Sequence, residues 1–276
     1  MRSFCLLGLM LVCADISSVS AQTMEYPLSV AAAKDGTLYV ADRNMPGIWK
    51  VKDGKAEVFF KGSKQFRTPL NAVRCVAIDE KGRLLAGDSA TREVYRFDEN
   101  AKPVPLTSGG IGIPMAIAVA SSGDIFVADL ELHRIWKVPA LGGKPEEVAA
   151  VQAPRGMTID SENRLWIVSH GKNHLIRLST DGNATVETIV EGQPFNFAHH
   201  IVLGENNVAY VIDGYAKTLW KVTDGKPEEF VKGEPLKNPV GLAINDKTIY
   251  IADPHQKAIY AVDPEGKLTS VFPANK

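Results

Sequence analysis

Histidine and arginine side chains are the groups of this 276-residue sequence with the greatest capacity for chemistry. An imidazole can bind Zn²⁺ or a similar ion, or it can act as a base near neutral pH. A guanidinium can hold a carboxylate or a phosphate through two hydrogen bonds. The side chains of interest are His170, His199, His200, His255, Arg74 and Arg155. They are spread over the chain, so the fold must assemble any site that contains them.

A repeated unit organises the chain. Residues 114–129 contain two apolar runs on either side of a Ser-Gly turn, and a third run follows a short polar loop. This pattern predicts three antiparallel strands. Similar segments recur at residues 27–42, 73–88, 154–169, 198–213 and 239–253. The sequence is therefore built from six copies of one unit.

The spacing of the copies predicts the architecture. The last residue of each second strand is aspartate in five copies and Ser169 in the fourth, and these positions are 40 to 46 residues apart. An aromatic residue follows seven positions later in five copies, which predicts a constant loop and a side chain packed between units. A fourth short strand completes each copy, and the second one is expected at residues 104–107. We expect an all-β fold, a six-bladed β-propeller of four-stranded antiparallel blades, as a single domain over residues 22–276.

The repeat resembles a known family. The pattern of Pro239, Gly241, Leu242, Ala243 and the closing Asp253 is similar to the NHL repeat. The wider resemblance is to the six-bladed propellers of the regucalcin/gluconolactonase (SMP-30-like) and strictosidine-synthase-like superfamily. It covers nearly all of residues 22–276. The resemblance implies the fold. It does not specify the function, because enzymes and binding modules both use this fold.

Strand connectivity predicts which residues meet. The start of each first strand and the end of each second strand lie on one edge of a blade, so one face of the disc collects them around the channel. The first-strand starts are Leu28, Arg74, Met115, Arg155, His199 and Val240. At the next position five copies have a small residue and the fifth has His200. The loops that carry His170, His255, Phe195 and Phe197 emerge on the same face. We expect the recurrent aspartates there to accept N–H bonds from the loops.

The resemblance also allows a test of metal binding. Resemblance to the gluconolactonase family implies an aspartate ligand at the position of Arg155 and an asparagine ligand at the position of Met115. Of the family's ligands only the glutamate has a match here, in Glu25. An arginine and a thioether cannot replace oxygen ligands of a hard cation, so we expect no lactonase-type site. Resemblance to the peptide-amidating lyase implies a zinc role for His199, with His170 and His255 as further candidate ligands. A divalent metal, Zn or Ca, stays open as a cofactor.

The N-terminus predicts the cellular compartment. Met1 and Arg2 precede an apolar run at residues 4–13, and small residues end at Ala21. This is typical of a secretory signal peptide at residues 1–21, and it predicts a secreted or periplasmic protein without stable membrane insertion. Lipidation at Cys13 is the alternative, which Val12 disfavours. Cys75 then has no disulfide partner and is expected to be a buried apolar residue.

Two functional hypotheses follow. In the first, the protein is a non-catalytic module that binds a small molecule, a peptide or a protein at the channel-mouth face. In the second, it is a lyase or hydrolase for a small anionic substrate: His199 or His200 is the base or metal ligand, Arg74 and Arg155 hold the anion, and Phe195 and Phe197 cover the site. The net charge of −1 and the lack of Lys/Arg-rich runs argue against nucleic acid as a partner.

Overall fold

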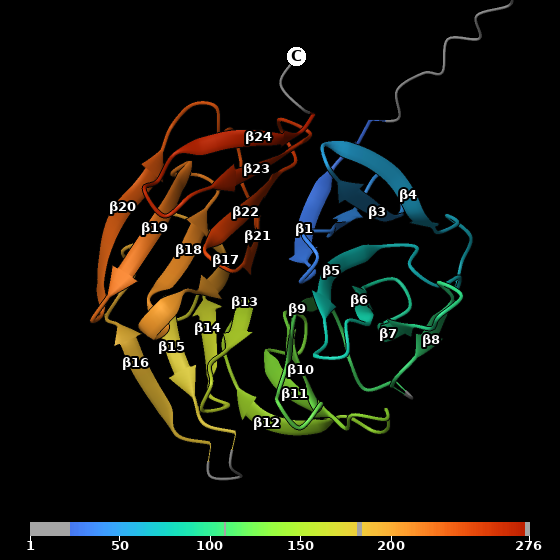
Figure 1. The fold of residues 1–276 in the computed structure, drawn as a ribbon. Helices are drawn as coiled ribbons and strands as arrows, with labels where there is room; N and C mark the ends of the chain where they lie inside the picture. The colour runs from blue at the N-terminus through green and yellow to red at the C-terminus, as the bar shows by residue number, and fades with distance from the viewer. Residues whose placement is uncertain (1–22, 108, 181–183, 274–276) are drawn as a thin grey trace, which may run out of the picture.

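Six four-stranded antiparallel sheets surround a central channel (Figure 1). The computed structural model describes residues 23–107, 109–180 and 184–273, and the predicted signal peptide lies outside them. Each sheet consists of four consecutive strands, in the order expected from the repeat. The prediction of a six-bladed propeller is therefore confirmed. No helix within the described ranges is long and apolar enough to cross a membrane.

The strands occupy four concentric positions. The innermost strands are β1 (Pro27–Ala32), β5 (Val73–Ile78), β9 (Pro114–Val119), β13 (Pro154–Ile159), β17 (Ala198–Leu203) and β21 (Gly241–Asn245). The second strands are β2 (Leu38–Asp42), β6 (Leu84–Asp88), β10 (Ile125–Asp129), β14 (Leu165–Ser169), β18 (Ala209–Asp213) and β22 (Thr248–Asp253). A short 3₁₀ turn at Glu205–Asn207 precedes β18.

The outer two positions complete the blades. The third strands are β3 (Gly47–Lys52), β7 (Glu93–Phe97), β11 (Arg134–Val138), β15 (Leu175–Leu178), β19 (Thr218–Thr223) and β23 (Ala258–Val262). The outermost strands are β4 (Lys55–Lys61), β8 (Pro103–Pro105), β12 (Glu146–Ala150), β16 (Val186–Val190), β20 (Lys226–Lys232) and β24 (Leu268–Phe272). Strand β8 ends earlier than predicted, because the backbone N–H of Thr107 turns to the Glu93 carboxylate, 2.7 Å away.

The core lies between neighbouring blades. Each of six apolar clusters joins two adjacent sheets, as when Ala116 and Ile135 of blade 3 share a cluster with Met157 and Leu165 of blade 4. Alternation along the strands supplies these residues, since alternate side chains point to the two faces of a sheet. Cys75 belongs to one cluster and is 1% exposed, as predicted, and burial raises the pKa of its thiol to about 12.

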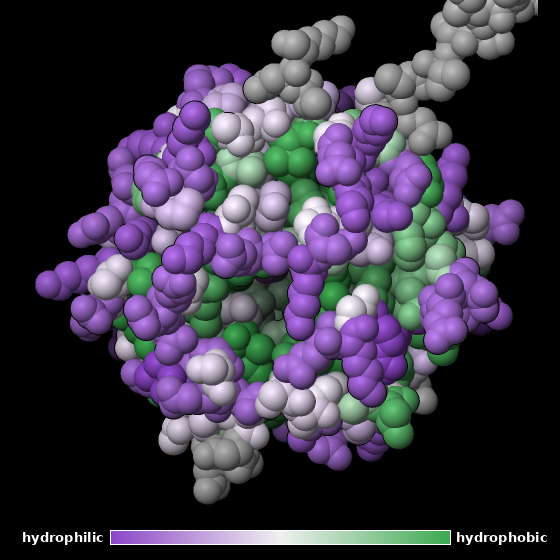
Figure 2. Space-filling model, in the orientation of Figure 1, coloured by the Kyte–Doolittle hydropathy of each residue, from purple (hydrophilic) through white to green (hydrophobic). Residues whose placement is uncertain are grey.

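The ring closes without exchange of strands between its ends. Blade 1 and blade 6 lie side by side and each is complete (Figure 1). Met24, which precedes β1, is fully buried in the cluster that joins them. Figure 2 shows a hollow at the centre of the disc, with hydrophobic residues inside it and hydrophilic residues around it. The segment before β1 therefore seals the junction and leaves the channel open.

Candidate functional site

The predicted face carries a cavity at the channel mouth. Its volume is about 160 Å³. All six predicted first-strand starts line it, together with Tyr26, Ser29, Arg43, His200 and Asn238. The structure thus brings Arg74, Arg155, His199 and His200 to one cavity.

Backbone bulges give the mouth residues their positions. Pro27 pairs with Asp42 and Ser29 with Ala41, so Leu28 between them has no partner on β2. The same register shift leaves Arg74, Met115 and His199 without a partner on the second strands of their blades. In blade 4 both Arg155 and Gly156 lack a partner on β14. A bulge bends a strand locally and redirects the side chain of the extra residue. Five of the six blades therefore direct one side chain each toward the channel mouth by the same device.

Three arginines give the cavity its charge. Arg43, Arg74 and Arg155 line it, and no ion pair among the described residues includes any of them. Arg74 donates from Nε to the Ser89 hydroxyl at 3.1 Å, and the Arg155 guanidinium lies 5.1 Å from the Phe197 ring centre. Burial, followed by the charge of Arg74, lowers the pKa of Arg155. The charge of Asp88 acts on Arg74, but no carboxylate of the described residues forms an ion pair with a mouth arginine, so the mouth concentrates positive charge.

His199 lies next to this charge. Burial lowers its pKa to about 4, and the charge of Arg155 acts in the same direction. The imidazole is therefore neutral at pH 7. Its Nε2 is buried and has no hydrogen-bond partner among the described residues. A neutral imidazole with an uncommitted nitrogen can accept a proton or a hydrogen bond from a ligand.

His200 separates the two ends of the channel. It lines the mouth cavity and also a second cavity of about 230 Å³, to which the inner strands contribute Val76, Ile117 and Met157. Burial lowers the pKa of His200 to about 4, and its Nδ1 has no partner among the described residues. The one large residue in its column therefore stands in the channel itself.

The two phenylalanines of the predicted covering loop have different environments. Phe197 lies under Arg155, and its ring centre is 4.4 Å from that of His170 and 4.9 Å from that of His199. Phe195 is only 3% exposed and packs in the core between blades 4 and 5. The structure places Phe195 away from the cavity, because its ring fills the space between His174 and Trp220.

The remaining histidines do not form a set of metal ligands. His170 Nε2 donates to the carbonyl of Ala198 at 2.8 Å, and His255 lies beside Tyr26 with ring centres 6.2 Å apart. Across the described residues no three His, Cys, Asp or Glu side chains are grouped closely enough to hold a metal ion. Arg155 and Met115 both line the mouth, so its donors do not fit a hard divalent cation. Metal binding by His170, His199 and His255 stays a prediction, and nothing below depends on it.

The recurrent aspartates are structural, as predicted. Both Asp42 oxygens accept N–H bonds from the segment before β1, namely from Glu25 at 2.7 Å and Tyr26 at 3.0 Å. The loop after β2 adds the N–H of Asn44, and Trp49 donates its indole N–H at 3.0 Å. Trp136 donates to Asp129 in the same way, at 3.0 Å, whereas the indole N–H of Trp220 has no partner among the described residues. The packing interpretation did not include this bond, which occurs in blades 1 and 3.

Sequence reasoning also missed four residues of this region. Arg43, Tyr26 and Asn238 line the cavity, and His174 lies next to His170 with ring centres 5.9 Å apart. Arg43 follows the aspartate at the end of a second strand. Tyr26 and Asn238 each precede the proline with which a copy of the repeat begins. These flanking positions could have been examined as systematically as the first-strand starts.

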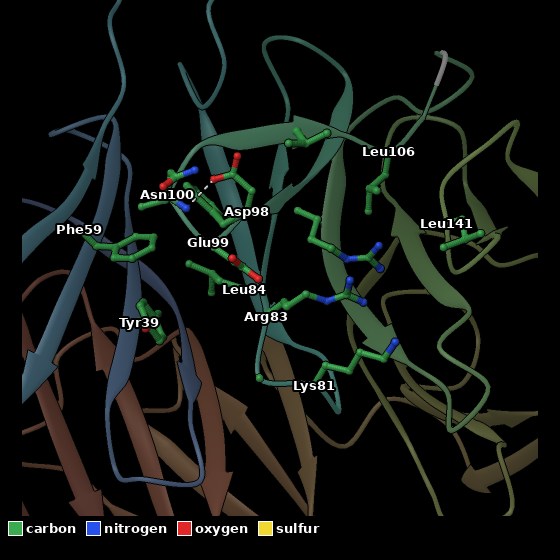
Figure 3. A pocket seen from close by; sticks show the side chains of 15 residues that line it. Tyr39, Phe59, Lys81, Arg83, Leu84, Asp98, Glu99, Asn100, Leu106 and Leu141 are labelled. Carbon is green, nitrogen blue, oxygen red and sulfur yellow. Dashed lines mark hydrogen bonds between the residues drawn. The ribbon is translucent and has the colours of Figure 1, made fainter.

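A larger cavity lies elsewhere and differs in charge. It has a volume of about 980 Å³, and Tyr39 and Phe59 face Lys81 and Arg83 across it (Figure 3). Arg83 donates to the Asp79 carboxylate at 2.8 Å. Arg96 donates to the carbonyl of Ala140 at 2.8 Å. Arg83 and Arg96 of this open cavity therefore both pair with the Asp79 carboxylate, at 2.8 and 3.7 Å, whereas no ion pair among the described residues includes a mouth arginine.

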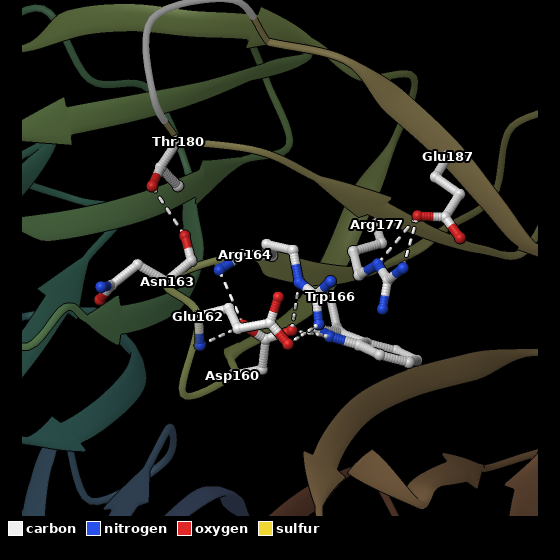
Figure 4. Close-up of polar contacts among 8 residues, drawn as sticks. All are labelled: Asp160, Glu162, Asn163, Arg164, Trp166, Arg177, Thr180 and Glu187. Atoms are coloured by element: carbon white, nitrogen blue, oxygen red, sulfur yellow. Dashed lines mark hydrogen bonds and ion pairs between the residues drawn. The ribbon is translucent and has the colours of Figure 1, made fainter.

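The same is true of the polar cluster on blade 4. Asp160 accepts hydrogen bonds from the Arg164 guanidinium and the Trp166 indole at 2.8 and 2.9 Å, and Arg177 pairs with Glu187 at 2.6 Å (Figure 4). These contacts hold the turn between β13 and β14 and join β15 to β16. They are internally satisfied and leave no charge for a ligand. The mouth remains the candidate site.

Comparison with known proteins identifies the family. The family described as "SMP-30/Gluconolactonase/LRE-like region" matches residues 11–198. The chain belongs to the SMP-30/gluconolactonase/LRE-like family. A search of curated protein sequences gives no match. Membership of this family agrees with the resemblance in the repeats and does not specify a ligand.

Solved structures with the same fold include members with different activities. A virginiamycin B lyase from Staphylococcus aureus is 18% identical, with a TM-score of 0.68 over 93% of this chain and 87% of that one. A gluconolactonase from Xanthomonas campestris is 14% identical, with a TM-score of 0.74 over 90% and 87%. A chain in a structure of a nidogen/laminin complex is 15% identical, with a TM-score of 0.68 over 84% of this chain and 97% of that one. At these identities the similarity establishes the fold of this SMP-30-like chain.

Proposed function

We propose that this SMP-30-like propeller binds a small ligand through a carboxylate or phosphate group at the channel mouth. The observation that carries the proposal is the presence of Arg43, Arg74 and Arg155 around one cavity without an acidic partner among the described residues. Positive charges placed together repel one another, and an anion relieves that repulsion. The bulges that direct Arg74 and Arg155 to the mouth hold these groups ready before the ligand arrives.

The cavity has the dimensions and the polar groups of a head-group site. A volume of about 160 Å³ admits a carboxylate or a phosphate with a few further atoms. Arg74 and Arg155 each offer a planar set of N–H donors, which suits two-point binding of such an anion. Tyr26, Asn238 and the neutral His199 supply additional polar groups at the walls. Secretion after cleavage at Ala21 is part of the proposal and rests on the N-terminal sequence alone.

Titration calorimetry tests the binding function. The mature protein is titrated with inorganic phosphate, phenyl phosphate, acetate and benzoate, and at least one of them is expected to bind with 1:1 stoichiometry. The double variant Arg74→Met plus Arg155→Met is expected to lose this binding, since truncating paired charges costs about 2–5 kcal/mol. Arg134→Met is the matched control, because Arg134 pairs with Glu147 on outer strands. Binding that survives the double variant would overturn the proposal.

An elimination reaction is the second candidate function. Nε2 of His199 is buried without a partner among the described residues beside Arg155, and a virginiamycin B lyase has the same fold. His199 would take the proton from the carbon next to the bound carboxylate. The C–H electron pair would form the new double bond while the leaving group departs with its own pair.

Proton exchange tests this second candidate without knowledge of the substrate. Pyruvate is incubated with the protein in D₂O, and deuterium entry into its methyl group is followed by NMR. Exchange that the His199→Gln variant lacks would support the lyase. If exchange is no faster than in buffer at pyruvate concentrations that saturate the site, the lyase candidate is rejected and the binding function remains.

A further inference from the structure

The mouth cavity opens outward into a second hollow. This outer hollow has a volume of about 440 Å³ and is lined by Tyr26, Gly214, Tyr215, Lys237, Asn238 and His255. Tyr26 and Asn238 line the mouth cavity as well. The two hollows are therefore neighbours that share the side chains of Tyr26 and Asn238.

The walls of the outer hollow are aromatic. Tyr215 is 64% exposed, and its ring is stacked on Phe197 at 4.7 Å with an angle of 26° between the planes. Tyr26 and His255 form an edge-to-face pair in the same hollow. Phe197 supports the Tyr215 ring from below, because it packs against His170 and His199. An exposed tyrosine fixed in this way presents a ring face for stacking.

Charge in the outer hollow is already compensated. Lys237 makes an ion pair with Glu234. The arginines that lack acidic partners line the inner cavity. The inner part therefore favours an anion, and the outer part favours a planar apolar group.

Gly214 packs closely against two residues of the mouth cavity. A Cβ atom at this position would lie 2.6 Å from Oδ1 of Asn238 and 2.9 Å from Nε2 of His199. The φ angle of Gly214 lies outside the left-handed region, so its backbone conformation does not require glycine. What glycine provides here is the close approach of its backbone to His199 and Asn238, so that these two side chains keep their positions between the two hollows.

We propose that the ligand is a small molecule in which a carboxylate or phosphate is joined to an aromatic ring. The anion lies among Arg43, Arg74 and Arg155, the chain passes Gly214, and the ring stacks on Tyr215 opposite Tyr26 and His255. This inference rests on the proposed function and adds the class of ligand to it. An aromatic pair of this kind contributes roughly a two- to tenfold increase in affinity.

Matched ligands test the aromatic requirement. Phenyl phosphate, cyclohexyl phosphate and inorganic phosphate are titrated into the mature protein, and benzoate and cyclohexane carboxylate form the carboxylate arm. The phenyl compound of one arm is expected to bind several-fold more tightly than its cyclohexyl counterpart. Whichever arm shows this preference identifies the anion. Equal affinity for phenyl and cyclohexyl compounds would overturn the inference and leave the anion site standing.

Two variants test the placement. Tyr215→Leu is expected to remove the phenyl preference while affinity for the bare anion stays unchanged. Gly214→Ala is expected to weaken the binding of the aryl anions more than tenfold, because the added methyl group displaces Asn238 and His199. Phe66→Leu, at an aromatic residue that is 83% exposed and lines neither hollow, is the control. A phenyl preference that persists in Tyr215→Leu would contradict the stacking, and absence of any anion binding would overturn the proposed function itself.

Discussion

Gly156 and His200 meet backbone to backbone at the junction of blades 4 and 5. A Cβ on Gly156 would lie 2.4 Å from Cα of His200 and 2.8 Å from the carbonyl oxygen of His199. Small residues in this column thus let inner strands approach closely. Because Gly156 has no side chain, the backbones of β13 and β17 come into contact. This contact places His199 and His200 at the channel.

Gly156→Ala is therefore expected to destabilise the fold. The methyl group overlaps backbone atoms that cannot move independently, and overpacking of this kind costs about 1–3 kcal/mol. Urea denaturation measures the loss. Gly192→Ala is the control, because nothing lies within 4 Å of its added Cβ and only its φ of +73° opposes the substitution. Gly156 has no positive φ, so a loss smaller than that of Gly192→Ala would contradict the predicted overlap with the His200 backbone.

Arg155→Met is expected to raise the stability of the ligand-free protein. The substitution removes a buried Nε without a partner and a charge that faces Arg74, and an unsatisfied buried donor costs about 1–3 kcal/mol. Thermal unfolding without added anions, at low and high salt, measures the effect. Wild type should gain stability with salt more than the variant does. A variant less stable than wild type would show that the contact of Arg155 with Phe197 outweighs its charge.

The free energy of unfolding is expected to fall as the pH drops from about 6.5 to about 4. Burial lowers the pKa of His199 and of His200 to about 4, so in this range the unfolded chain binds protons that the folded chain does not. Each histidine contributes up to about 1.4 kcal/mol per pH unit. Urea titrations at several pH values should give a shallower slope for His200→Leu, and an unchanged slope for Phe66→Leu, which removes no titratable group. Equal slopes in all three proteins would contradict the argument from burial.

Asp42→Asn is expected to loosen the segment that carries Tyr26. The carboxylate accepts N–H bonds from Glu25, Tyr26 and Asn44 and from the Trp49 indole, and it is fully buried. In the variant an amide NH₂ group replaces one carboxylate oxygen and cannot accept from these donors. The protein therefore loses hydrogen bonds to a charged group, each of which contributes about 1.5–3 kcal/mol. Hydrogen exchange of residues 23–28 should accelerate. Trp49→Phe, which removes only one donor, should have a smaller effect on the same peptide.

The architecture was predictable because it is repeated. Six copies with constant spacing determine the blades, the order of their strands and the column of residues from Leu28 to Val240 that lines the mouth. The repeats did not predict the indole bond to the aspartates or the early end of β8. Both depend on individual side chains, Trp49 and Glu93, that accept or donate in three dimensions.

The candidate site was predictable in part. Arg74, Arg155, His199 and His200 meet as expected, because strand connectivity alone brings the first-strand starts together. Phe195 does not, since an apolar residue in a loop can turn into the core as easily as toward a ligand. Tyr215 and Gly214 were missed because their importance comes from residues distant in the sequence, Phe197 for Tyr215 and His199 and Asn238 for Gly214, which no local pattern reveals.

The bulges at the inner strands have a consequence for protein engineering. The residues they carry, such as Leu28, Arg74 and His199, lie outside the hydrogen-bonded register of their blades and outside the apolar clusters that join the blades. Side chains at these positions can therefore be exchanged together while the parts that determine folding stay constant. A library that varies only the bulged residues would give receptors of different charge and shape on one unchanged scaffold.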